Sequence, residues 1–94
     1  MYVPNESQVN FPIGTVITLI NMYDWSNNNT YMYINAQSDP DGQDFGGWDQ
    51  PLIYLAGQGN GYSPSWGLKG IGTATLMKVG RNEWLLTGNC VNTN

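Results

Sequence analysis

Histidine is absent from this 94-residue chain, and Cys90 is its only cysteine. No disulfide can form within the chain, because a second cysteine is missing. A four-ligand structural zinc site is excluded on ordinary terms, since one thiol and no imidazole cannot complete it. Histidine acid–base catalysis and nucleophilic Ser–His or Cys–His pairs are excluded as well. We therefore expect no enzymatic activity and no cofactor, and with no neighbouring base we expect Cys90 to be an inert, small apolar residue.

Charge is also scarce. Three basic residues oppose seven acidic ones, and charged residues make up 11% of the chain, against about 25% in ordinary soluble proteins. The net charge of −4 argues against nucleic acid as a partner, because nucleic-acid binding draws on clustered Lys and Arg. It argues equally against an anionic membrane surface. Residues 1–10 lack the basic and apolar regions of a signal peptide, and no apolar run approaches the roughly 20 residues that cross a bilayer.

Strand patterns dominate what is present. Glycine and proline interrupt the chain so often that no helical apolar spacing develops. The β-branched, aromatic and alternating stretches predict one domain over residues 1–94, an all-β fold built as a small antiparallel β-sandwich or barrel-like module with long loops. The expected strands are Thr15–Ile20, Thr30–Asn35, Leu52–Gly57, Thr73–Val79 and Glu83–Gly88.

Two turns are marked by their residues. The sequence Phe-Pro-Ile-Gly at residues 11–14 should bend the chain into the first long strand. Residues 80–82, Gly-Arg-Asn, should close the last hairpin, with Gly80 supplying a positive φ.

Two strands look apolar on both faces, which favours burial between subunits. Residues 15–20 carry apolar side chains at successive positions, and in residues 83–88 Leu85 points away from Trp84 and Leu86. Leu85 therefore lies on the more polar face of this strand, and we expect that face to be buried as well. The interface residues that we expect on these strands are Val16, Thr18, Ile20, Trp84 and Leu85.

Aromatic residues in glycine-, serine- and proline-rich segments form a second group. Trp48, Tyr62 and Trp66 fall outside the strand patterns. Such side chains roof a small core, anchor a protein interface, or stack on sugar rings, and the sequence leaves all three roles open.

The acidic residues Asp39, Asp41 and Asp44 lie within six positions of one another. Alternate Asp side chains with a glycine are used by calcium-binding loops, yet the distant Glu and the full ligand count are missing. Asp-Pro-Asp-Gly is also an ordinary turn sequence, which we favour. A carboxylate pair for glycoside hydrolysis needs a cleft that so small a chain rarely provides.

The two ends of the chain resemble one known module. Residues 10–21, NFPIGTVITLIN, and residues 70–89, GIGTATLMKVGRNEWLLTGN, resemble a small β module of tailed-bacteriophage virion structural proteins, while the middle of the chain hardly resembles it at all. The matching positions are Phe11, Pro12, Gly14, Thr15 and Ile17 at the start, and Ala74, Thr75, Leu76, Lys78, Val79, Trp84, Leu86 and Gly88 at the end.

The resemblance implies a non-enzymatic virion protein, since such modules occur in capsid decoration proteins, tail fibres and spikes, and are commonly trimeric. We expect a capsid decoration (cement) protein, made in the host cytoplasm and located on the capsid exterior or tail. Its expected partners are itself, as a homotrimer, and the major capsid protein or other virion proteins. The alternative is a tail-fibre or spike module that binds host glycans through Trp48, Tyr62 and Trp66. The resembling modules carry a further hairpin before the segment that matches residues 3–9, so a neighbouring chain is one source of that strand.

Removing calcium tests the role of the three aspartates. If Asp39, Asp41 and Asp44 are turn residues, EDTA leaves the thermal unfolding midpoint unchanged, because no bound ion stabilises the folded chain. Circular dichroism melts with and without EDTA measure this. A marked fall of the midpoint in EDTA, restored by added calcium, would instead assign a cation site to this segment.

Overall fold

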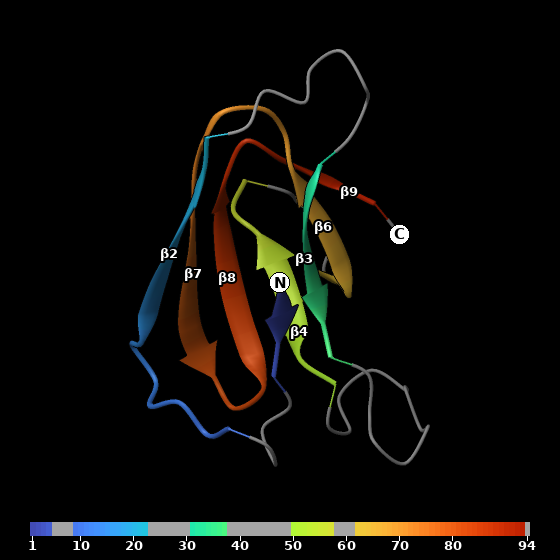
Figure 1. The fold of residues 1–94 in the computed structure, drawn as a ribbon. Helices are drawn as coiled ribbons and strands as arrows, with labels where there is room; N and C mark the ends of the chain where they lie inside the picture. The colour runs from blue at the N-terminus through green and yellow to red at the C-terminus, as the bar shows by residue number, and fades with distance from the viewer. Residues whose placement is uncertain (5–8, 23–30, 38–49, 58–61, 94) are drawn as a thin grey trace.

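The computed structural model describes residues 1–4, 9–22, 31–37, 50–57 and 62–93, which form two β-sheets packed face to face (Figure 1). The expected all-β sandwich is therefore confirmed. Within these ranges no helix is long and apolar enough to span a membrane.

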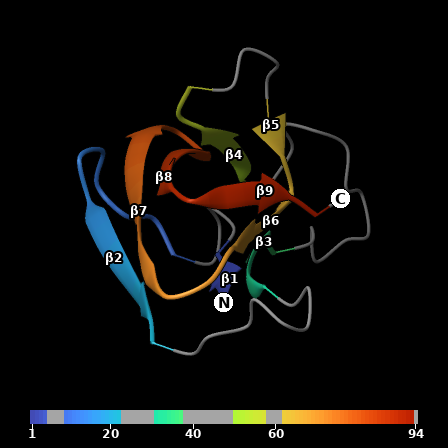
Figure 2. The same cartoon turned by 90° about the horizontal axis from the view of Figure 1, so that it is seen from above.

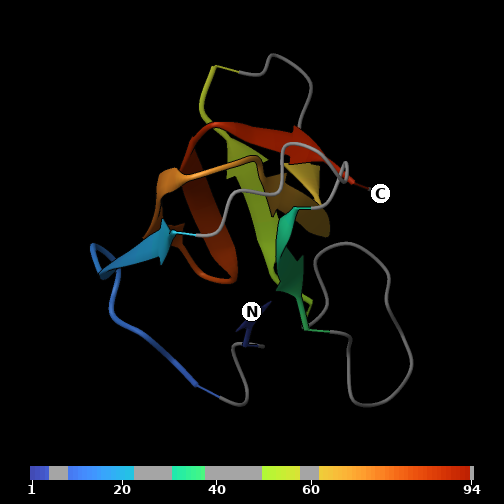
Figure 3. The same ribbon diagram turned by 45° about the horizontal axis from the view of Figure 1, so that its top comes forward.

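The larger sheet has five strands and contains the last hairpin. Its order is β2-β7-β8-β4-β5, which leaves β2 at one edge (Figures 1 and 3). The strands are β2 (Val16–Asn21), β7 (Gly72–Gly80), β8 (Glu83–Gly88), β4 (Leu52–Leu55) and β5 (Tyr62–Ser63).

The smaller sheet has four strands in the order β1-β3-β6-β9. The first and the last strand of the chain, β1 and β9, are its two edges, and β3 and β6 lie between them. The strands are β1 (Tyr2–Val3), β3 (Met32–Ala36), β6 (Ser65–Leu68) and β9 (Cys90–Asn92).

Strand direction differs from the expectation of an antiparallel fold. Both sheets are mixed, because β1 pairs with β3 in parallel and β4 pairs with β8 in parallel. An alternating sequence identifies a strand and its buried face but carries no information on the direction of its neighbour. In each parallel pair the chain passes through the other sheet between the two strands: β2 lies between β1 and β3 in sequence, and β6 lies between β4 and β8.

The core lies between the sheets and follows from strand alternation. Every second residue of β7 and β8 points inward, so Leu76, Trp84 and Leu86 are buried. The smaller sheet contributes Ile34 and Trp66 from the opposite side. The inner faces are mostly apolar, with Ser63 and Lys78 among the buried polar residues.

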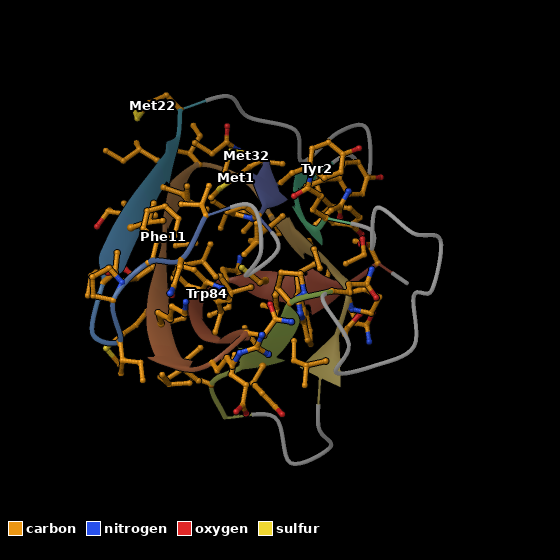
Figure 4. All side chains as sticks on the ribbon, turned by 90° about the horizontal axis from the view of Figure 1, so that it is seen from below. Met1, Tyr2, Phe11, Met22, Met32 and Trp84 are labelled. Carbon is orange, nitrogen blue, oxygen red and sulfur yellow. The ribbon has the colours of Figure 1, made fainter. Side chains whose placement is uncertain are left out.

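Residues 10–21 and residues 70–89, which lie far apart in sequence, touch each other. The Phe11 ring meets the Trp84 ring edge-on, with centroids 5.8 Å apart (Figure 4). The Gly14 amide donates to the Lys78 carbonyl at 2.8 Å, and the Lys78 amide donates to the Thr15 carbonyl at 2.9 Å. Segments more than 60 residues apart in sequence therefore form one structural unit.

The expected bend at residues 11–14 is present. The Thr15 amide donates to the Pro12 carbonyl at 3.1 Å, and Gly14 at the third position of this turn has φ of 96°. A positive φ at that position is what a type II turn requires, and glycine adopts it without a steric penalty.

The last hairpin closes differently from the expectation. The residue with a positive φ is Asn82, at 60°, and not Gly80. Gly80 instead pairs with Glu83 beside an irregularity in the β7–β8 ladder. Asparagine tolerates the left-handed region, and a bulge shifts the turn by one residue, so Gly80 falls within the strand.

The chain changes sheets at two corners that lie side by side. One corner leads from β6 to β7 and the other from β8 to β9 (Figure 2). They are joined by hydrogen bonds, since the Lys69 amide donates to the Asn89 carbonyl at 2.9 Å and Asn89 Nδ2 donates to the Lys69 carbonyl at 3.2 Å. Gly88 stands at the second corner with φ of 143°.

Gly88→Ala is expected to destabilise the fold. A Cβ at this position would lie 2.9 Å from the Thr73 carbonyl oxygen and 3.1 Å from the Ala74 Cβ, and the backbone angle is one that L-residues rarely adopt. We expect a loss of about 2 kcal/mol in the free energy of unfolding, measured by urea titration. Gly57→Ala is the control: it also has a positive φ but nothing lies within 4 Å, so it should cost less. Equal costs would contradict the close-approach explanation.

Candidate functional site

The outer face of the five-stranded sheet is the candidate site. Val16, Thr18 and Ile20 on β2 are exposed, and Leu85 on β8 is half-buried on the same side. Four of the five interface residues expected from the sequence therefore share one face. We call it the outer apolar face, and its further members are Leu52, Tyr54, Thr73, Thr75, Met77, Val79, Glu83 and Thr87.

One row of large side chains crosses this face. Val16 pairs with Met77, Met77 with Leu85, and Leu85 with Tyr54. Directly paired residues lie about 4.5–5.5 Å apart at Cβ, so the four side chains form a continuous apolar stripe across four strands. Val16 is 54% exposed and Met77 is 36% exposed.

Threonine side chains form the next row. Thr18 pairs with Thr75, and Thr75 pairs with Thr87. Among the described residues of the outer apolar face Glu83 alone is charged, and its Oε2 accepts a hydrogen bond from the Tyr54 hydroxyl at 3.4 Å. The surface can thus be covered by another protein surface without stripping water from isolated charges.

The β2 strand borders the outer apolar face with an edge that no other described strand pairs. Over the described ranges β2 pairs with β7 and with no other strand. Because the Lys78 amide bonds to the Thr15 carbonyl, antiparallel alternation directs the backbone groups of Val16, Thr18 and Ile20 away from β7. The strand carries neither proline nor charge, which are the usual devices that prevent edge pairing.

Trp84 does not belong to this face, which corrects one expected interface residue. Its side chain is 2% exposed and packs in the core against Phe11. The expectation that Trp84 and Leu86 point away from Leu85 is correct, and this alternation is what places Trp84 inside.

Trp66 is likewise a core residue and not a ligand or partner contact. It is 2% exposed, and its indole Nε1–H lies 3.0 Å from the Ile53 carbonyl oxygen and 3.1 Å from that of Ser63. Since Trp66 is on β6 and these carbonyls are on β4 and β5, the indole links the two sheets. The neighbouring Ser and Gly make residues 65–68 look like a loop in sequence.

The other residues expected to contact a ligand, a partner or a metal lie outside the described part of the structure, either entirely or in their side chains. Trp48 and the three aspartates Asp39, Asp41 and Asp44 lie outside the described residues. Tyr62 starts β5, and its side chain also lies outside the described part.

Cys90 is buried on β9, which agrees with an unreactive role. Burial raises the pKa of its thiol from 9.0 to about 11. The thiol therefore stays protonated at neutral pH, and the thiolate that would act as a nucleophile is scarce.

Two features of this region were missed by sequence reasoning. Met77 completes the stripe, and the alternation of residues 73–79 would have placed it beside Thr75. Lys78 is 2% exposed and points into the molecule, where its ammonium donates to Asn10 Oδ1 at 3.4 Å. The same alternation places Lys78 on the inner face with Ala74 and Leu76, but charged side chains are normally assigned to the surface, so that signal was not used.

Comparison of the chain with protein-family models, with curated proteins and with solved structures gives no match.

Trp66→Phe is expected to weaken the contact between the sheets. Phenylalanine keeps an aromatic ring but removes the N–H donor from two buried carbonyls and leaves a small void. We expect a loss of about 2–3 kcal/mol in unfolding free energy by urea titration. Tyr33→Phe, at an exposed position, is the control and should change stability by less than about 0.5 kcal/mol. A Trp66→Phe protein as stable as the wild type would refute the linking role.

Proposed function

We propose that this chain is a non-enzymatic structural protein of a bacteriophage virion, a capsid decoration protein that assembles through the outer apolar face. The observation that carries the proposal is the stripe of Val16, Met77, Leu85 and Tyr54, aligned by strand pairing on a face with one described charge. The resemblance of residues 10–21 and 70–89 to phage virion modules supplies the biological setting.

Self-association is the first requirement of this role. Fully burying an exposed Val or Ile side chain contributes about 1.5–3 kcal/mol, so covering Val16, Ile20 and Met77 contributes on the order of 5 kcal/mol per copy. The edge of β2 that no other described strand pairs adds backbone hydrogen bonds if a strand of a neighbouring copy lies beside it. We propose a homotrimer, in which each copy covers this face of the next and another part of the surface contacts the major capsid protein.

Light scattering tests the assembly. The purified chain should have the mass of a trimer at micromolar concentration, and Met77→Lys should shift it to monomer, because the lysine would bury a charge at the centre of each contact. Ile13→Lys is the matched control, since Ile13 is 69% exposed in the turn before β2 and should leave the trimer intact. A wild-type monomer, or a trimer that survives Met77→Lys, would contradict the proposal.

Binding to particles tests the virion role separately. Fluorescently labelled wild-type chain should co-sediment with intact particles of the phage that encodes it, at a fixed number of copies per particle. Labelled chain that stays in the supernatant while remaining trimeric would reject decoration but not self-association.

A further inference from the structure

The opposite surface of the molecule, the outer face of the four-stranded sheet, has a different chemistry. Tyr2 pairs with Asn35, Asn35 pairs with Ser65, and the Thr93 amide donates to the Ser65 carbonyl at 3.2 Å. These four side chains form a row across β1, β3, β6 and the residue after β9, which we call the polar row. Figure 4 shows Tyr2 beside β1 and β3.

Hydrogen bonds give the polar row a direction. The Ser65 hydroxyl donates its one hydrogen to Asn35 Oδ1 at 2.7 Å, so in the contact between Ser65 and Thr93 the Thr93 hydroxyl is the donor. Both hydrogens point toward Asn35, and such a chain polarises its last member. The Asn35 Nδ2 group, with two N–H donors, has no acceptor among the described residues.

Two exposed tyrosine rings flank this amide. Tyr2 is 70% exposed and is the cross-strand partner of Asn35, while Tyr33 is 47% exposed and precedes Asn35 by two residues on the same face. The Tyr31 ring meets the Tyr33 ring edge-on at 6.4 Å and 83°. Tyr31 in turn lies over Gly67, where an added Cβ would be 2.6 Å from the Tyr31 Cβ, so Gly67 gives Tyr31 the room to support Tyr33.

The backbone beneath these side chains is fixed on both sides. The Asn35 amide donates to the Met1 carbonyl at 3.0 Å, and the terminal ammonium donates to the Tyr33 carbonyl at 3.0 Å. Main-chain pairing with β6 holds the other edge of β3. The backbone that carries these side chains is therefore ordered, the Tyr33 ring is supported by Tyr31, and the Asn35 amide is held by Ser65 before any ligand arrives, which lowers the entropy cost of binding.

We propose that this face binds a neutral saccharide. A pyranose ring presents C–H groups on its flat side, which pack on an aromatic face, and hydroxyl groups at its edge, which accept from an amide N–H. Tyr2 and Tyr33 supply the first contact and Asn35 Nδ2 supplies the second. None of the four side chains of the polar row is charged, which favours a neutral ligand. The positive group beside the row is the Met1 ammonium, which donates to the Tyr33 carbonyl at 3.0 Å, and the acidic glycans of the array below measure its effect.

This inference is independent of the proposed virion role, because it uses the other sheet and none of the residues of the outer apolar face. The experiments distinguish the two roles. The chain could decorate capsids without binding sugars, or bind sugars without forming a trimer, and each result would be recognised separately.

A glycan array followed by calorimetry tests the proposal. The array carries neutral hexose, N-acetylhexosamine and deoxyhexose chains together with sialylated and sulfated chains. We expect retention on neutral chains, and the best retained chain then serves as the titrant. Asn35→Asp should weaken its binding at least about tenfold, because the carboxylate still accepts from Ser65 but lacks the N–H donors. Tyr33→Ala should weaken it similarly by removing the stacking surface.

The controls separate binding from folding. Tyr33→Phe keeps the ring and should bind within about twofold of the wild type. Met22→Ala, at a position that is 75% exposed and belongs to neither the polar row nor the outer apolar face, should bind normally. Thermal melts establish that each variant is folded, and Asn35→Asp carries the test if Tyr33→Ala does not fold. No retention on neutral chains, retention on acidic chains alone, or unchanged binding by Asn35→Asp would overturn the proposal.

Discussion

The indole of Trp66 holds the two sheets in one relative position. Its N–H points at the Ile53 and Ser63 carbonyls of the opposite sheet, within a mostly apolar core. The Ser63 hydroxyl adds a second link between the sheets by donating to Asn92 Oδ1 at 3.0 Å. Apolar packing alone is non-directional, whereas a buried hydrogen bond specifies an arrangement. Once the sheets are fixed face to face, strand alternation decides which side chains are inside, and the two outer faces follow.

The sequence predicted the position of the long strands and the buried side of each better than it predicted which strands pair and in which direction. The β8 bounds agree with the predicted residues 83–88, and the opposition of Leu85 to Trp84 and Leu86 is correct, because alternation is a local property. The short strands β5, β6 and β9 were not predicted, because Ser, Gly or Asn in each of them interrupts the apolar pattern. The parallel pairs were missed because strand direction depends on crossovers elsewhere in the chain.

The same limit applies to the candidate site. Val16, Thr18, Ile20 and Leu85, all expected at an interface, share one face that no neighbour within the described chain covers, whereas Trp84, also expected there, is buried. Trp66, whose role the sequence left open between core and contact, is buried as well. Tryptophan beside Ser, Gly or Asn looks exposed in sequence, and only the packing of the second sheet shows otherwise. The outcome is a molecule with an aliphatic outer face on one sheet and a tyrosine and amide face on the other, which suits assembly on one side and recognition on the other.

Oxidation of methionine by peroxide tests burial of the outer apolar face most directly. Met77 is 36% exposed on that face, and Met1 is 43% exposed beside the other sheet, so the two thioethers are matched within one molecule. As protein concentration rises through the range in which copies associate, the account predicts that oxidation of Met77 slows several-fold relative to Met1, measured by mass spectrometry of peptides. A ratio of Met77 to Met1 oxidation that stays constant over this range would contradict it.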